Sequence, residues 1–195
     1  MSGLSHGAAS RPHDATVRVW DVPQRVCHWV LALSVLTAWL SANIYDALHE
    51  AAGYLAMGAV AFRLVWGLVG TTYARFRNFV RPPAAVLRYL RDLAHGRAAR
   101  HLGHNPAGAA MAVTLLVMVA TSTITGWMQL TYTFFGVTWV EVMHTWSSHL
   151  VLALALVHVC GVLTMCAVQK ENLVRAMITG RKAAGESGDD TPPSR

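Results

Sequence analysis

Residues 144–168 read HTWSSHLVLALALVHVCGVLTMCAV, an apolar stretch long enough to cross a bilayer, with one histidine at its start and another deep inside it. His144 and His158 are fourteen residues apart. In an α-helix this is about four turns, so the two side chains share one face and lie roughly 21 Å apart along the axis. Because imidazole is costly to bury among apolar side chains, we expect both rings to be paired or bound to a metal.

The composition of the whole chain indicates a membrane protein. Of its 195 residues, 54% are hydrophobic and only 13% are charged, whereas a soluble domain carries about 25% charged residues. Four apolar stretches are near the length of about 20 residues that a membrane helix needs. These predicted spans cover approximately residues 26–44, 51–70, 107–128 and 145–168. The chain is therefore predicted to be all-α, an integral membrane four-helix bundle.

The distribution of charge predicts the orientation of this bundle. Lysine and arginine precede the first span, lie between the second and third, and follow the fourth, whereas residues 45–48 and 129–140 contain neither. By the positive-inside rule, both termini are then cytoplasmic. The net charge of +6 thus indicates topology and not a nucleic-acid partner.

The spans and the segments between them are expected to form one domain over residues 17–182. Residues 1–16 and 183–195 are rich in Ser, Gly, Pro and charge, and are expected to be disordered tails. The first of these tails lacks the usual form of a cleavable signal peptide. Residues 84–99, after a double proline, are predicted to form a short amphipathic helix on anionic lipid.

Four histidines fall at matched depths in the predicted bundle. His28 and His158 lie toward the cytoplasmic side, and His49 and His144 lie toward the outer side. Two haems, each held by one of these pairs, are the favoured interpretation; ligation by two imidazoles suits electron transfer. For His49 or His144 taken singly, a histidine at the membrane interface is the simpler interpretation. For His158, among leucines and alanines, that interpretation needs an additional partner.

Arg63 is the only formally charged residue inside a predicted span. It shares the helix face of His49 but lies at the depth of the inner pair, so it either pairs with a haem propionate or extends to nearby lipid headgroups. His104 either contacts a propionate or caps its loop, and capping is the favoured interpretation. His149 faces away from both proposed ligands of its helix. The three cysteines form no C-x-x-C-H motif, so a covalently attached haem is not supported.

Several motifs together resemble the prokaryotic cytochrome b561 family, which includes the b-type cytochrome subunits of nickel–iron hydrogenases. The resemblance covers about residues 18–182. Its motifs are VRVWDVP at 17–23 with Arg25 and His28-Trp29, His49 with Gly53-Tyr54, FRLVWG at 62–67, GHNPAG at 103–108, and His144 and His158 followed by ENLVRAMITG at 171–180.

The resemblance implies a four-helix protein of the bacterial cytoplasmic (inner) membrane that contains haem b. Such proteins exchange electrons between the quinone pool of a respiratory chain and a redox partner, here expected to be a c-type cytochrome or another oxidoreductase subunit. The ligand positions of the family fall on His28, His49, His144 and His158. Whether the chain is an enzyme or an electron-transfer protein stays open at this point.

Two other functions are compatible with the sequence. The chain is either a haem-bearing anchor of a larger oxidoreductase such as a hydrogenase, or a non-haem four-helix transporter or scaffold. A very short loop between the first two spans and the absence of a span after the fourth differ from some hydrogenase subunits. A transporter or scaffold predicts colourless protein.

Overall fold

The computed structural model describes residues 16–183 except Arg100 and Leu102. The expected all-α class is confirmed, apart from two strands of three residues each. The elements are β1 (Thr16–Arg18), α1 (Val22–Ser41), α2 (Asp46–Val69), α3 (Phe76–Phe79), α4 (Pro83–Ala94), α5 (Pro106–Gln129), α6 (Thr138–Gln169), α7 (Leu173–Thr179) and β2 (Arg181–Ala183). The tails expected to be disordered lie outside the described residues, except for Thr16 and Ala183.

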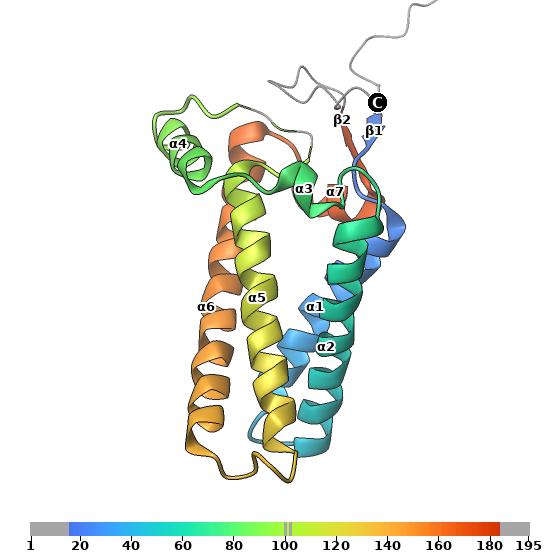
Figure 1. The fold of residues 1–195 in the computed structure, drawn as a ribbon. Helices are drawn as coiled ribbons and strands as arrows, with labels where there is room; N and C mark the ends of the chain where they lie inside the picture. Colours follow the sequence, from blue (N-terminus) through green and yellow to red (C-terminus); the bar gives the residue numbers. More distant parts are fainter. Residues whose placement is uncertain (1–15, 100, 102, 184–195) are drawn as a thin grey trace, which may run out of the picture.

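Four long helices, α1, α2, α5 and α6, run alongside one another, and the short elements gather at one end (Figure 1). The closest packing joins α1 to α2 and α5 to α6, and α2 also contacts α5. The hydrophobic core is thin, with Ala56, Val60, Val119 and Val151 at its centre.

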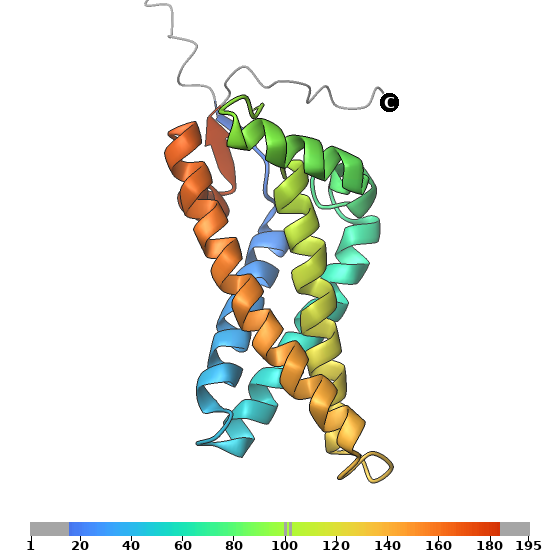
Figure 2. The ribbon, with the colours of Figure 1, turned by 90° about the vertical axis from the view of Figure 1, so that its left-hand side faces the viewer.

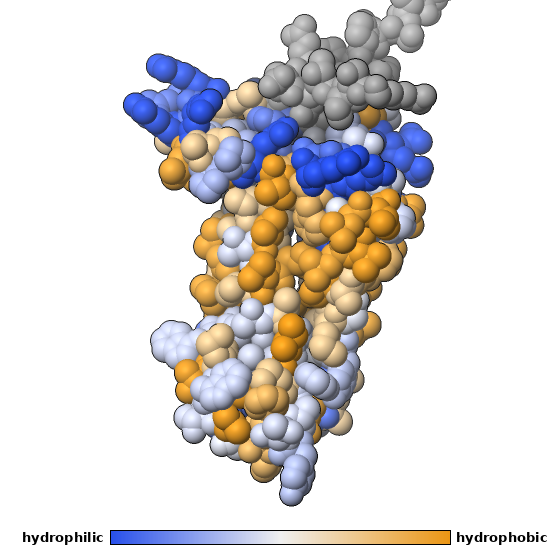
Figure 3. Space-filling model, in the orientation of Figure 1, coloured by the Kyte–Doolittle hydropathy of each residue, from blue (hydrophilic) through white to orange (hydrophobic). Residues whose placement is uncertain are grey.

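Most large hydrophobic side chains of the long helices point outward, and Leu68, for example, is 74% exposed. Figure 3 shows these apolar residues along the sides of the molecule and strongly hydrophilic residues at the end that carries α3 and α4. An apolar surface of this extent is stable only when lipid or another protein covers it.

Three of the four expected spans, in α2, α5 and α6, are confirmed as helices long and apolar enough to cross a membrane. Helix α1 has 20 residues, but its first turns contain Gln24, Arg25 and His28, and these lower its hydropathy. A span in α1 therefore stays a prediction. Helix α6 is longer than expected, since it begins at Thr138 rather than at residue 145.

Helix α4 lies across the end of the bundle (Figure 2), where the sequence predicts an amphipathic surface helix. It ends at Ala94, five residues earlier than predicted. Tyr89 anchors it, with a buried ring and a hydroxyl 4.0 Å from the Met165 sulfur. Arg88 and Arg91 are exposed on the same helix.

The first turn of α1 is held to the end of α2 by one carboxylate. Asp21 Oδ1 accepts a hydrogen bond from the Gln24 amide at 2.8 Å, which caps the helix. Its Oδ2 accepts hydrogen bonds from Trp66 Nε1 at 3.0 Å and from the Thr71 hydroxyl at 2.5 Å. This contact sets the position from which α1 carries His28 into the bundle.

The two described chain ends are also joined at this end of the molecule, which sequence analysis did not predict. β1 and β2 pair antiparallel, with Thr16 opposite Ala183. Gly180 ends α7 with a φ of +80°, and its carbonyl accepts hydrogen bonds from the amides of Val19 and Trp20. A Cβ at Gly180 would lie 2.6 Å from the Trp20 oxygen, so a larger residue does not fit.

Replacing Asp21 with asparagine is expected to destabilise the fold. An asparagine still caps α1, but its amide does not provide the acceptor that Trp66 and Thr71 share, at a cost of about 1–3 kcal/mol. The measurement is thermal unfolding in detergent, with a midpoint lowered by about 2–4 °C for each kcal/mol. Asp46→Asn, at an exposed acidic residue that begins α2, is the matched control. Equal shifts in both variants would contradict this role of Asp21.

Candidate functional site

His28 and His158 face each other at the end of the bundle near α3. His28 lies in the second turn of α1, and His158 lies about two-thirds of the way along α6. Their ring centres are 6.4 Å apart, and the ring planes are inclined by 58°. Both side chains are half-buried, and neither forms a hydrogen bond with the residues that the structure describes.

His49 and His144 face each other toward the opposite end, with ring centres 6.1 Å apart. His49 Nδ1 lies 2.7 Å from the Ala38 carbonyl oxygen, and His144 Nδ1 lies 2.8 Å from the Ser122 carbonyl oxygen. Since a carbonyl only accepts, each Nδ1 carries the proton and donates it, and each Nε2 keeps its lone pair. This is the tautomer in which a backbone carbonyl orients a histidine that binds a metal through Nε2.

The separation of the rings in both pairs fits an iron between two imidazoles. Bonds of about 2 Å from a metal to each nitrogen place the two ring centres roughly 6 Å apart. Aromatic pairs in direct contact cover the same range, but such contacts do not explain why both Nε2 atoms of the outer pair are left as acceptors. No cluster of three or more His, Cys, Asp or Glu occurs among residues 16–183 as described. A haem iron needs only two protein ligands, because the porphyrin supplies the other four.

Glycines beside the outer pair leave room around the rings. A Cβ at Gly126 would lie 2.9 Å from His144 Cε1, so the ring packs directly on the backbone of α5. At Gly53, one turn after His49, a Cβ would meet no atom within 4 Å, and this open space suits a flat macrocycle. Gly67 is different, since it accommodates the ring of Phe76 and serves helix packing. Taken together, the residues present fit two haems.

An apolar layer separates the two pairs. Val151 lies seven residues from His144 and seven from His158, and it packs with Ala56 and Val119 in the central cluster. Such a layer keeps water from the path between the pairs and lowers the local dielectric.

Arg63 is turned toward the connection between α2 and α3. Its Nη2 donates a hydrogen bond to the Ala74 carbonyl at 3.1 Å, and its guanidinium lies 4.7 Å from the centre of the Phe76 ring. The other terminal nitrogen, Nη1, is buried and has no partner within the described part of the chain. Arg63 is therefore held inside the protein with one donor unused.

His104 does not take the capping role that the sequence analysis favoured for it. The cap of α5 is Asn105, whose side-chain oxygen accepts a hydrogen bond from the Gly108 amide at 2.7 Å, so capping by His104 is not supported. Instead, the His104 ring packs between Phe79 and Trp20, with centroid distances of 4.6 Å to each. Burial first, and then the nearby charge of Arg63, lower the pKa of His104 to about 3.

The sequence analysis also missed Gln24, although its spacing from His28 pointed to the site. It lies four residues before His28 and therefore on the same face of α1. Its side chain is only 4% exposed, and its Oε1 has no partner among the described residues. A buried glutamine one turn from a candidate ligand is a reason to include it in the site.

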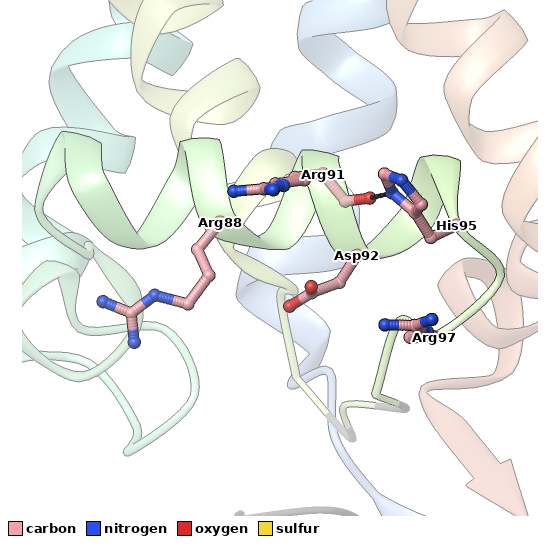
Figure 4. A pocket seen from close by; sticks show the side chains of 5 residues that line it. All are labelled: Arg88, Arg91, Asp92, His95 and Arg97. Atoms are coloured by element: carbon pink, nitrogen blue, oxygen red, sulfur yellow. Dashed lines mark hydrogen bonds between the residues drawn. The ribbon is translucent and has the colours of Figure 1, made fainter.

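The remaining histidines of α4 and α6 lie outside this arrangement. His149 is exposed, and its Nδ1 donates to the Thr145 carbonyl of its own helix at 2.7 Å. His95 borders a hollow on α4, drawn in Figure 4, and its Nδ1 donates to the Arg91 carbonyl at 2.7 Å. The hollow is lined by Arg88, Arg91, Asp92, His95 and Arg97. Because most of these side chains are exposed, this is a basic surface and not an enclosed site.

Comparison with known proteins gives one family match and one relative. A family model described as prokaryotic cytochrome b561 matches residues 19–180, a range that contains all four paired histidines and Arg63. A protein of Bradyrhizobium diazoefficiens, named as a probable Ni/Fe-hydrogenase B-type cytochrome subunit, is 22% identical over 223 aligned positions, which cover 90% of this chain and 88% of the relative. No solved structure matches the chain.

A leucine at Gly126 is expected to displace the His144 ring and lower the haem content of the purified protein. The side chain would occupy the space that the ring now fills against α5, and the hydrogen bond to Ser122 would be lost. Gly161→Leu on α6 is the control, because a Cβ there meets no atom within 4 Å. Haem is measured as its pyridine complex, relative to protein. Equal haem content in the two variants would show that the approach at Gly126 is not needed.

Proposed function

Because this chain belongs to the prokaryotic cytochrome b561 family, we propose that it is a dihaem b-type cytochrome that carries electrons between the quinone pool and a redox partner. The observation that supports this most strongly is the pairing of four histidines across the long helices, with one pair toward each end. A single haem would need only one such pair.

In this proposal, His28 and His158 hold an inner haem, and His49 and His144 hold an outer one. When bound in this way, haem supplies one-electron transfer and has no open coordination position for oxygen. The protein orients the outer ligands through the Ala38 and Ser122 carbonyls and excludes water from the layer between the pairs. The two pairs lie roughly 21 Å apart by helix rise, and the edges of the macrocycles lie closer than their centres.

The proposed setting is the bacterial inner membrane, with α1, α2, α5 and α6 as four spans and both termini in the cytoplasm. The described chain ends, β1 and β2, lie at the same end of the molecule as α3 and α4 (Figure 1). The connection that contains α3 and α4 holds a run of arginines, whereas residues 42–50 and 129–141 at the opposite end contain no Lys or Arg. The positive-inside rule assigns the arginine-rich end to the cytoplasm.

The proposed partners are lipid, a quinone and either a c-type cytochrome or another oxidoreductase subunit. A second candidate function is that of a haem-bearing anchor in a larger complex such as a hydrogenase, which is supported by the name of the similar Bradyrhizobium protein. A stable stoichiometric partner on purification from the native membrane would favour the anchor. The non-haem transporter or scaffold is disfavoured, because the chain belongs to a cytochrome family.

The proposed ligands predict the number of haems per chain. The wild-type protein is expected to contain two b-type haems, and replacement of His28, His49, His144 or His158 by alanine is expected to leave one. His149→Ala is the control on α6, since that side chain is exposed and bonds only to its own helix. The measurement is a dithionite-reduced minus oxidised spectrum combined with a haem-to-protein ratio. A ratio of one in the wild type would reduce the proposal to a single pair.

Arg63 is proposed to pair with a propionate of the inner haem through its unused Nη1. Loss of this positive charge in Arg63→Leu disfavours the added electron, so the inner haem is expected to become about tenfold harder to reduce, or about 59 mV lower in potential. Arg63→Lys keeps the charge and is expected to shift the potential less. A redox titration followed by absorbance measures both. An unchanged inner potential in Arg63→Leu would rule out the pairing.

A further inference from the structure

Three buried polar atoms without partners lie at the end of the bundle that holds His28 and His158. They are Gln24 Oε1, Arg63 Nη1 and His104 Nδ1, each without a hydrogen bond from any described residue. Two further atoms of this kind are not used here: Arg25 Nε lies at the same end, where the Arg25 guanidinium donates through Nη1 to the Ile178 carbonyl of α7, and Ser34 Oγ is more than one turn beyond His28 on α1. Buried polar groups are normally satisfied, so three unsatisfied ones at one end of the bundle require an explanation.

The three side chains come from separate elements and are connected by shared neighbours. The Phe79 ring packs on His104 at 4.6 Å and lies 5.8 Å from the Arg63 guanidinium. Gln24 lies between Asp21 and Cys27 on α1, and both of these are within electrostatic range of Arg63. Trp20 and Phe79, both buried, border the space on the side of His104.

We propose that His104 and Gln24, together with Arg63, form a pocket for the carboxylate of the inner haem, and that His104 is a positioning residue that raises the affinity of this haem for an electron. This inference rests on the proposed function, because it takes the inner haem as the source of the carboxylate. It gives Gln24 a role that the sequence analysis did not consider, and it takes up for His104 the propionate contact that the sequence analysis left as an alternative.

The chemistry of the three groups favours an anion. Arg63 provides a cationic donor, His104 provides a ring N–H, and the Gln24 amide turned by 180° provides its NH₂. Asp21, which caps α1 on this face, offsets part of the Arg63 charge from a distance, but its two oxygens already accept hydrogen bonds from Gln24, Trp66 and Thr71 and none comes from the unpartnered atoms. The aromatic neighbours reduce contact with water, which strengthens hydrogen bonds to a charged acceptor.

The position of the pocket favours a haem carboxylate over a lipid phosphate. His104 lies within electrostatic range of both His28 and His158, whereas its Nδ1 is fully buried. A hydrogen bond from His104 to a carboxylate draws negative charge away from the macrocycle. Loss of this bond therefore makes the reduced haem less favourable and lowers its potential.

The test uses a background in which only the inner haem is expected, the His144→Ala variant. In this background, His104→Phe keeps an aromatic ring between Trp20 and Phe79 but removes the N–H, while His104→Gln keeps a donor. His101→Phe is the control, because this histidine lies on the same connection and packs on Tyr89 instead. Each protein is titrated spectroelectrochemically in nanodiscs of phosphatidylcholine and, separately, of phosphatidylglycerol.

We expect His104→Phe to make the inner haem about tenfold harder to reduce, which for one electron is about 59 mV. His104→Gln is expected to recover most of this shift, and His101→Phe is expected to cause none. Gln24→Leu is measured in parallel and is expected to lower the same potential, so the proposal stays testable if His104→Phe loses its haem.

Three results would overturn the proposal. An unchanged potential in both His104→Phe and Gln24→Leu would show that neither residue contacts the carboxylate. An equal shift in His101→Phe would indicate a general effect of the connection. A shift seen only in phosphatidylglycerol would identify a lipid phosphate as the anion. The haem-to-protein ratio of the His144→Ala variant tests the proposed function separately. If the proposed function is wrong, this variant does not contain one haem per chain.

Discussion

In hydrocarbon, a polar side chain has no water to bind and must find its partner within the protein or in a cofactor. Four imidazoles in the long helices of this chain are partly buried among apolar residues, and the structure brings them together in pairs. The outer pair is further fixed by two backbone carbonyls, which accept hydrogen bonds from the two Nδ1 atoms and leave both Nε2 atoms as acceptors. The packing of the helices has to satisfy this pairing, since a small rotation of any one helix would separate its ring from the partner.

The arrangement at the inner end shows how short-range contacts support that pairing. Asp21 joins the start of α1 to the end of α2, and Gly180 joins the returning chain to the residues just before α1. His28 lies less than two turns after Asp21, so the position of its side chain depends on the contacts of both Asp21 and Gly180. The same end contains Arg63 and His104, which each keep one buried nitrogen without a partner among the described residues and pack against the Phe79 ring. Structural support and candidate chemistry are thus concentrated in one region.

Most of the apolar side chains of the long helices lie on the outer surface and not in the core. A thin core of small and β-branched residues is sufficient, because lipid rather than protein is expected to cover the remaining apolar side chains. Small residues in the centre allow the helices to approach closely, as Ala56 beside Val119 and Val151 illustrates. A soluble protein of this size would need a much larger core.

The sequence alone was sufficient to predict the four long helices and which of four histidines lie close to each other, because hydropathy and the 3.6-residue period are local properties of the chain. It predicted the depth of Arg63 but left its contacts open. The junction of β1 with β2, the double role of Asp21 and the burial of His104 between Trp20 and Phe79 were decided only by the tertiary structure. Each of these depends on segments distant in the chain meeting at one end of the bundle, and no local pattern encodes which side chains meet there.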